Sequence, residues 1–573
     1  MGRYLLALMS VPVICCGWAQ QSVPPGGSSS DKTRLLLRQL TDSGTLPDLR
    51  WPKFFGCQNF VAKFYETTGY GFAWVQNGAL TPQARSIISV LQDAAARGLD
   101  PEDYDGSRWQ ARMAHLRPAC AQPSYDDLAR FDLALTISVM RYVSDLRVGK
   151  VNPKVFCFGL DVDGKRCDLA EFLRTRLVHT SDVPLALEQL DPPFEAYRRT
   201  AAALRTYLAL ARDDDGELLP STKKPVEPGD LYPGSARLRR LLLRLGDLPA
   251  DVTIPANSQL YQRDLPEAVK HFQIRHGLEP DGRIGTATLK QLNTPLKRRV
   301  RQLQFALERW RWVPEQFVRP PVIVNIPEFR LRAYNDRYQP ELEMKVVVGG
   351  AYRHQTPIFA EEMTLVIFRP YWNVPLSIQR AELVPKLKRD PAYLESNDYE
   401  IVGADGKVTE GKAITADLLA QLHSGKLSIR QKPGAKCALG FVKFLFPNEH
   451  SVYLHGTPAK ALFMKSRRDF SHGCIRVERP EELALWVLRD QQGWNLDRIR
   501  EAEAGSQPVS VSLNRPIPVL ILYSTAVVQE SGEVYFFDDI YKHDASLEEL
   551  LDKGYPYSDW KPTSAAPGRR PRE

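Results

Sequence analysis

The chain has 573 residues, of which 43% are hydrophobic and 25% charged, and its formal net charge is +8. This composition excludes a mostly disordered chain, and at ~100–200 residues per domain the length predicts about two to four domains. The charge excess is mild and contains no dense basic block, so we interpret it as an ordinary solvated surface. We find no nucleic-acid module in the sequence.

The first residues predict an export signal, residues 1–19. Met1-Gly2-Arg3 is a short positive region, Tyr4 to Cys16 is apolar, and small residues precede a cleavage site after Ala19. An uncleaved anchor remains an alternative. Residues 20–32 are rich in Ser, Gly and Pro and predict a flexible linker. No later segment approaches ~20 apolar residues, so we expect no further membrane-spanning helix.

Residues 33–230 predict a helical scaffold domain. Apolar residues recur at helical spacing in 80–99, with Thr81 and Pro82 as a start signal and Gly98 as a stop signal. A polar, Pro-containing stretch near 213–229 then predicts a domain boundary.

Residues 235–296 predict a bundle of three helices, covering 236–245, 265–278 and 286–293. Pro266 opens the second helix and Gly277 ends it. A linking helix follows in 297–314.

Residues 315–545 predict a β-rich domain, so the fold class is α+β with several domains. Strand patterns cover 322–327, 329–334, 342–348, 364–368, 441–446, 518–523 and 533–537. Helical periodicity in 376–436 interrupts them and predicts an inserted lid. Residues 546–573 form a C-terminal segment and tail.

The most informative stretch of the sequence contains His455, His472, Gly473 and Cys474. A nearby imidazole can convert a thiol into a nucleophilic thiolate, and backbone N–H groups at a glycine can face a developing oxyanion. The alternatives are ordinary packing and a zinc site. Zinc is disfavoured because no Cys-x-x-Cys, His-Glu-x-x-His or paired carboxylates lie nearby. We therefore expect a nucleophile–base pair with no metal and no cofactor.

The run His-Gly-Thr-Pro at 455–458, followed by Ser-His-Gly-Cys-Ile-Arg-Val at 471–477, resembles the signature of the YkuD-type L,D-transpeptidases. These are cysteine enzymes of the bacterial cell wall. Residues 98–101 and 142–150 resemble the large periplasmic YcbB subtype. Residues 235–296 resemble the type 1 peptidoglycan-binding domain, with a plain spacer bundle as the alternative. The resemblance implies a periplasmic protein that acts on peptidoglycan stem peptides and glycan, associates peripherally with the wall and admits other cell-wall synthesis enzymes as partners.

The resemblance also implies a mechanism. Cys474 attacks the carbonyl of the third residue of a stem peptide, D-Ala leaves, and an amine of a second stem resolves the thioester into a 3→3 cross-link. His455 is the general base, oriented by the Gly456 carbonyl, and the N–H groups of Gly473 and Cys474 are the oxyanion donors.

His472 and Arg476 line the site by family analogy. Arg476 suits a substrate carboxylate, although a strand arginine with a surface partner is the plainer interpretation. Tyr453 and Trp372 are site aromatics or packing residues.

Three rivals remain open. Water as acceptor would give an L,D-carboxypeptidase or endopeptidase, and a lipoprotein lysine would give an anchoring transferase. A chain with a vestigial catalytic domain would be a peptidoglycan-binding scaffold only.

Six cysteines follow the predicted signal: Cys57, Cys120, Cys157, Cys167, Cys437 and Cys474. One hypothesis pairs Cys57 with Cys120 and Cys157 with Cys167, although connectivity cannot be read from a sequence. Many relatives have Asn at the position of Cys437, which we interpret as a structural residue.

Overall fold

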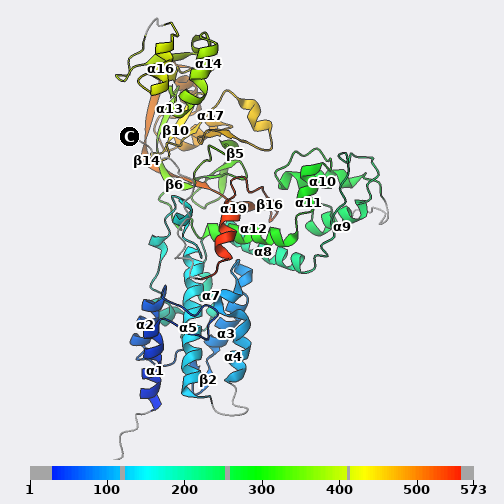
Figure 1. Ribbon diagram of the computed structural model, residues 1–573, viewed down its shortest axis with the longest axis vertical. Helices are drawn as coiled ribbons and strands as arrows, with labels where there is room; N and C mark the ends of the chain where they lie inside the picture. The colour runs from blue at the N-terminus through cyan, green and yellow to red at the C-terminus, as the bar shows by residue number, and fades with distance from the viewer. Residues whose placement is uncertain (1–28, 117–122, 252–258, 410–412, 556–573) are drawn as a thin grey trace, which may run out of the picture.

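The computed structural model describes residues 29–116, 123–251, 259–409 and 413–555. Figure 1 shows an elongated molecule with a helical part at the bottom, a helical arm at one side, a β-sheet region above them and a small subdomain at the far end. The predicted signal 1–19 and Cys120 lie outside the described residues. Helix α1 begins at Ser29, inside the predicted linker. Within the described ranges, no helix is both long enough and apolar enough to cross a bilayer.

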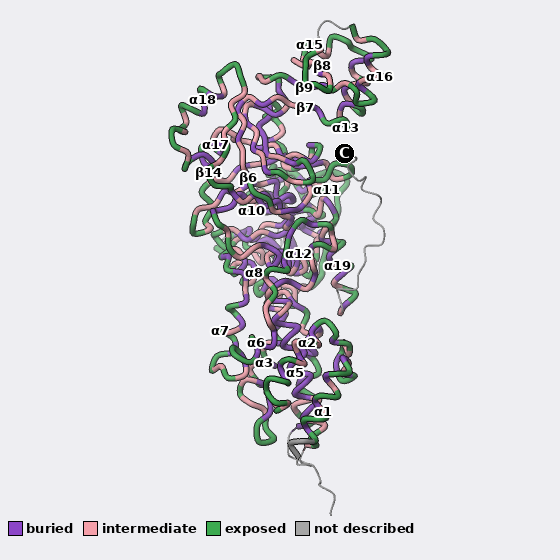
Figure 2. The backbone as a smooth tube through the Cα atoms, turned by 90° about the vertical axis from the view of Figure 1, so that its left-hand side faces the viewer, coloured by how far each residue is buried: buried purple, intermediate pink, exposed green. Residues whose placement is uncertain are grey.

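The lower part is helical, as the periodicity predicts. Its elements are α1 (Ser29–Ser43), α2 (Gln58–Thr67), the hairpin β1 (Val75–Gln76) and β2 (Ala79–Leu80), α3 (Pro82–Gln92), α4 (Trp109–His115), α5 (Tyr125–Val148), α6 (Leu169–Phe172) and α7 (Val183–Glu188). Helix α8 (Glu195–Arg212) follows and lies above this part in Figure 1. The Thr81 side chain caps α3 by accepting from the Ala84 amide at 3.1 Å. Helix α5 is buried along most of its length and forms the centre of this part (Figure 2).

The side arm contains α9 (Ser235–Leu245), α10 (Asp264–Arg275) and α11 (Thr286–Leu292), close to the three predicted helices. Arg275 is buried, pairs with buried Asp247 and donates to the Val534 carbonyl at 3.2 Å. The bond to Val534 docks the arm against a hairpin of the β-rich part. Helix α12 (Leu296–Trp310) leads from the arm into that part and packs against α8.

Nine strands among the described residues form one sheet, in the order β12-β5-β13-β11-β10-β6-β14-β3-β4. Their bounds are β3 Val322–Asn325, β4 Arg330–Tyr334, β5 Pro340–Gly349, β6 Phe359–Phe368, β10 Val442–Leu445, β11 Leu454–His455, β12 Asp469–Ser471, β13 Ile475–Val477 and β14 Val509–Leu522. Because β4 also pairs with β5, the sheet closes on itself and β12 stays outside the ring. The enclosed face holds the largest hydrophobic core.

Strands β6 and β14 are longer than the sequence predicts. They pair with each other along their length, with a register shift between Ser512 and Ile517. The Asn-Arg-Pro of 514–516 therefore sits in an irregularity of a continuous strand, where a sequence pattern indicates a break.

Outside the nine-stranded sheet, the β-rich part also contains α17 (Pro480–Val487), α18 (Leu496–Ala504), β15 (Ala526–Val528), β16 (Val534–Phe536) and α19 (His543–Leu551).

The small subdomain at the far end of the molecule, which we call the cap, starts earlier than predicted. It contains β7 (Trp372–Asn373), α13 (Leu376–Ile378), a π-helical turn η7 (Gln379–Leu383), α14 (Val384–Arg389), α15 (Tyr393–Ser396), β8 (Tyr399–Val402), α16 (Ala416–Ser424) and β9 (Ser428–Gln431). A sequence reading gives helices alone here, whereas β7, β9 and β8 form a three-stranded sheet. The cap has its own small core.

Candidate active site

Three neighbouring strands bring the predicted site residues to one face of the sheet. Strand β11 pairs in parallel with β13, so His455 lies opposite Arg476, and it pairs antiparallel with β10, so His455 also lies opposite Lys443. Tyr453 and Cys474 each lie two residues before this register point, directly before the first residues of β11 and β13. Because paired residues and residues two apart share a face, these five side chains face the same side.

His455 is buried, and its Nδ1 lies 2.5 Å from the Gly456 carbonyl oxygen. A carbonyl oxygen can only accept, so Nδ1 carries the proton and Nε2 is the nitrogen left to accept one. Burial lowers the pKa of His455 to about 3, and the positive charges of Arg476 and Lys443 act in the same direction. The resting imidazole is therefore neutral.

Cys474 is partly exposed, and its Sγ lies 3.7 Å from the Ser451 carbonyl oxygen. Burial raises the pKa of the Cys474 thiol, although hydrogen bonds from Tyr453 and the charges of Lys443 and Arg476 oppose this rise. The sequence predicts His455 as the base that takes the thiol proton. The raised pKa of Cys474 and the lowered pKa of His455 describe the two groups before such a transfer.

The two amides predicted as oxyanion donors, those of Gly473 and Cys474, differ from each other in the structure. The Gly473 amide donates to Ser471 Oγ at 3.2 Å, so it is not free to bind an oxyanion in this conformation. The Cys474 amide has no hydrogen-bond partner in the part of the chain that the structure describes.

Arg476 is half-buried, and no ion pair or hydrogen bond holds its guanidinium within the described residues. Its Nε is buried without a partner. Burial lowers the pKa of Arg476, and the Cys474 sulfur raises it. This is not the strand arginine with a surface partner that the plainer interpretation expects.

The aromatic residues link the site to the cap. The Tyr453 hydroxyl interacts with the Trp372 side chain on β7, and burial raises the pKa of Tyr453 well above its ordinary value. The Tyr453 ring lies 5.6 Å from the His455 ring and 3.9 Å from Lys443 Nζ.

His472 contacts the cap. Its Nε2 lies 2.6 Å from Glu382 Oε1, on the π-helical turn η7, and its ring lies 4.7 Å from the His354 ring. Sequence reasoning missed both Glu382 and Lys443. The alternation of β10 could have revealed Lys443, the polar residue between buried Val442 and Phe444, but nothing local singles out Glu382.

The other cysteines lie apart from this chemistry. Cys437 is buried, with its Sγ 3.5 Å from the Pro370 carbonyl oxygen, and burial raises its pKa. Cys57, Cys157 and Cys167 are free thiols, so the hypothesis of a Cys157–Cys167 bridge is wrong for this structure.

A partly exposed thiol and a buried imidazole lie on one face of the sheet, and a separate subdomain contacts the residues next to them. Such a set of groups is typical of enzymes that use a cysteine nucleophile. Comparison with known proteins shows which family of such enzymes this part of the chain resembles. A family model for the L,D-transpeptidase catalytic domain (YkuD) matches residues 320–511. A model described as "Putative peptidoglycan binding domain" matches 233–292, and one described as "Scaffold domain" matches 59–204. The chain therefore carries a YkuD-type L,D-transpeptidase catalytic domain together with a peptidoglycan-binding domain.

One curated relative, "Putative L,D-transpeptidase" of Haemophilus influenzae, is 33% identical over 226 residues. The match covers 39% of this chain and 45% of that relative, so the chain matches less than half of the relative's length. A crystal structure of the L,D-transpeptidase (residues 123–326) from Xylanimonas cellulosilytica is 15% identical, over 53% of this chain and 100% of that one. Its TM-score of 0.17 supports no argument about the fold.

Proposed function

We propose that this protein is a periplasmic L,D-transpeptidase that forms 3→3 peptidoglycan cross-links through a thioester on Cys474. The observation that carries the proposal is the shared sheet face of His455, Cys474 and Arg476, which the register of β10, β11 and β13 produces. The peptidoglycan-binding domain supports peptidoglycan as the partner.

In the first step, the Cys474 thiol proton passes to His455 Nε2 while the sulfur bonds to the carbonyl carbon of the third stem residue. The bond from that carbon to the D-Ala nitrogen then breaks, and the proton on His455 goes to the departing amine. In the second step, an amine of another stem attacks the thioester carbon and gives its proton to His455. The sulfur leaves, is reprotonated, and a new amide bond remains.

The electrostatics of the site support this order of events. Lys443 and Arg476 favour the thiolate and disfavour an imidazolium, so a proton taken up by His455 is readily passed on. The unpartnered Arg476 guanidinium is chemically suited to a carboxylate of the substrate, because its planar fork can donate to two oxygens.

The cap acts as a lid in this proposal. Two contacts support this role: the 2.6 Å pair of Glu382 with His472, and the interaction of Trp372 with Tyr453. Both join the cap to residues beside the thiol. A substrate reaching Cys474 would have to pass between the cap and the sheet.

Intact-mass measurement after incubation with a carbapenem tests the nucleophile. We expect one covalent adduct on the wild type and on Cys437→Ala, and none on Cys474→Ala. Cys437→Ala is the matched control because it removes a second, buried thiol of the same domain. An adduct that persists in Cys474→Ala would refute the assignment.

Muropeptide analysis separates the acceptors. Dimers joined 3→3 support a transpeptidase, whereas trimmed monomers indicate an L,D-carboxypeptidase and shortened cross-bridges an endopeptidase. Peptidoglycan attached to a lipoprotein lysine would indicate an anchoring enzyme. An unchanged profile after Cys474→Ala would leave only a wall-binding scaffold.

A further inference from the structure

The peptide between Gly473 and Cys474 is held from one side. Thr356 Oγ1 donates to the Gly473 carbonyl at 2.7 Å, and Thr356 is itself buried. A trans peptide is planar, with its C=O and N–H pointing in opposite directions. The bond to Thr356 therefore turns the Cys474 N–H away from Thr356. Gly473 has a φ of +115°, a conformation that suits glycine, so the loop reaches this geometry without a side chain.

Thr356 is anchored in turn by Tyr541, a residue outside the stretch that matches the catalytic-domain family. The Tyr541 hydroxyl accepts from the Thr356 amide at 3.2 Å and donates to the Gly349 carbonyl at 2.5 Å. The Gly349 amide donates to Thr356 Oγ1 at 2.9 Å. Tyr541 thus pins both ends of the exposed 350–355 loop and fixes the hydroxyl that orients the Gly473 carbonyl.

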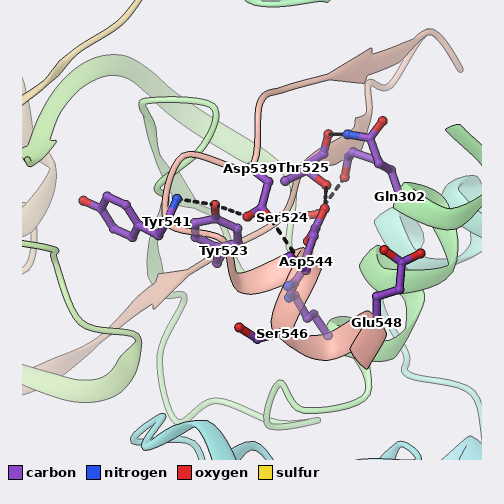
Figure 3. A network of polar contacts seen from close by, with 12 residues as sticks. Gln302, Tyr523, Ser524, Thr525, Asp539, Tyr541, Asp544, Ser546 and Glu548 are labelled. Carbon is purple, nitrogen blue, oxygen red and sulfur yellow. Dashed lines mark hydrogen bonds and ion pairs between the residues drawn. The ribbon is translucent and has the colours of Figure 1, made fainter. Parts of the chain in front are cut away.

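A polar network holds Tyr541 in place (Figure 3). The Tyr541 amide donates to the Tyr523 hydroxyl at 3.0 Å, and that hydroxyl donates to Asp539 at 2.6 Å. Asp539 also accepts from the Ala545 amide at 3.1 Å, at the start of α19. In the same first turn of α19, Asp544 accepts from Thr525 Oγ1 and from Arg309 on α12, each at 2.5 Å.

We propose that Thr356 and Tyr541 are positioning residues that aim the Cys474 N–H at the oxyanion formed when Cys474 is acylated. The inference rests on the proposed function, because it assumes attack of Cys474 on a carbonyl. The segment Phe537–Leu551 then belongs functionally to the catalytic domain. Neither residue touches the substrate in this role, and both act through the Gly473–Cys474 peptide.

Two reagents with different requirements test this role. Acylation by a carbapenem passes through an oxyanion, whereas alkylation by iodoacetamide needs only the thiol. Thr356→Val keeps the branched shape and removes the hydroxyl. We expect the rate of acylation to fall about tenfold or more. Complete loss of an oxyanion donor lowers the rate by about 10²–10³-fold, and a Cys474 N–H that points in the wrong direction should lose part of that factor. Alkylation should stay within about twofold of the wild type.

Matched variants separate positioning from folding. Thr356→Ser keeps the hydroxyl and should restore acylation. Tyr541→Phe removes both contacts of its hydroxyl and should slow acylation selectively. Ser546→Ala removes an exposed hydroxyl of α19 that bonds only the Lys542 carbonyl, and should change neither rate.

Each outcome is decisive. Equal losses of acylation and alkylation in Thr356→Val, or no loss of acylation, would overturn the positioning role. A wild type that iodoacetamide labels at Cys474 but a carbapenem leaves unmodified would overturn the proposed function itself, and the positioning role with it.

Discussion

Gly440 lies against Gly456, whose carbonyl orients the imidazole of His455, the proposed base. It has a φ of +63°, and a Cβ built on it would lie 2.6 Å from the Thr457 amide nitrogen and 2.8 Å from the Gly456 carbonyl carbon. Both are backbone atoms, so no flexible side chain can move aside. Gly456 in turn accepts from His455 Nδ1 at 2.5 Å.

The substitution Gly440→Ala therefore has two costs. A left-handed conformation costs a residue with a Cβ roughly 1–2 kcal/mol. To restore an ordinary contact of 3.4 Å, the Thr457 nitrogen must also move by about 0.8 Å. The Gly456 carbonyl moves with it and turns the imidazole, and a misplacement of about 1 Å in a catalytic group can cost about 10²-fold in rate. We expect acylation of Cys474 to fall by about one to two orders of magnitude.

The control is Gly406→Ala in the cap. Gly406 has a similar φ of +75° and nothing within 4 Å of its added Cβ, so this variant has the strain without the displacement. Acylation by a carbapenem, followed by mass spectrometry and accompanied by a thermal melt, compares the two. We expect both variants to lose stability and only Gly440→Ala to lose most of its rate. Equal acylation rates would refute the claim that Gly440 sets the position of His455.

Three further predictions concern the cap, a buried histidine and the free thiols. Glu382→Gln removes the carboxylate from its contact with His472, a pair in which both side chains are more than a third exposed and which is worth ~0.5 kcal/mol. Amide exchange in 376–436 should rise about twofold, and unchanged exchange would show that this pair does not hold the cap. Burial lowers the pKa of His543 from 6.5 to about 4, so the unfolded chain binds more protons between these pH values and stability falls as the pH drops. Between pH 6.5 and 4, the melting temperature of His543→Phe should therefore fall by less than that of the wild type. Equal falls in the two proteins would contradict this prediction. Cys157 should react with a maleimide without prior reduction, whereas a Cys157–Cys167 disulfide in non-reducing peptide mapping would contradict the structure.

Local signals account for the parts of the fold that the sequence predicts well. Helix α3 begins at its Thr81 and Pro82 signals because those residues determine backbone geometry by themselves. It ends at Gln92, earlier than predicted, and left-handed Gly98 instead ends the 3-10 helix Ala94–Arg97 that follows. The cap is less predictable. Its strands β7 and β8 are short and gain their pairing from β9, which lies far along the chain. The Cys157–Cys167 hypothesis rests on which cysteines remain if Cys474 stays free, and that does not determine the geometry that a disulfide needs.

The residues of the site also divide into those that a local motif predicts and those that depend on distant segments of the chain. His455 and Cys474 can be found from their motif because the spacing between them fits two neighbouring parallel strands. No motif identifies Glu382, Thr356 or Tyr541. Each comes from a different segment of the chain to the region around the Cys474 loop, and the sequence next to each of them carries no distinctive pattern. The motif predicted Gly473 as an amide donor, but the structure gives that amide to Ser471, a pairing that depends on the local turn.

His455 is hydrogen-bonded to a backbone carbonyl and not to a carboxylate, and the charges around the ring explain why this suits the site. In the proposed reaction, a carboxylate at that position would favour an imidazolium and would place a second negative charge on the face where Cys474 ionises. The Gly456 carbonyl orients the ring without that charge, while Lys443 and Arg476 supply a positive field on the same face. Such a field stabilises a thiolate, an oxyanion and a substrate carboxylate together and destabilises a proton held on the ring. The site is therefore suited to an imidazole that passes a proton on during the reaction and does not store it between turnovers.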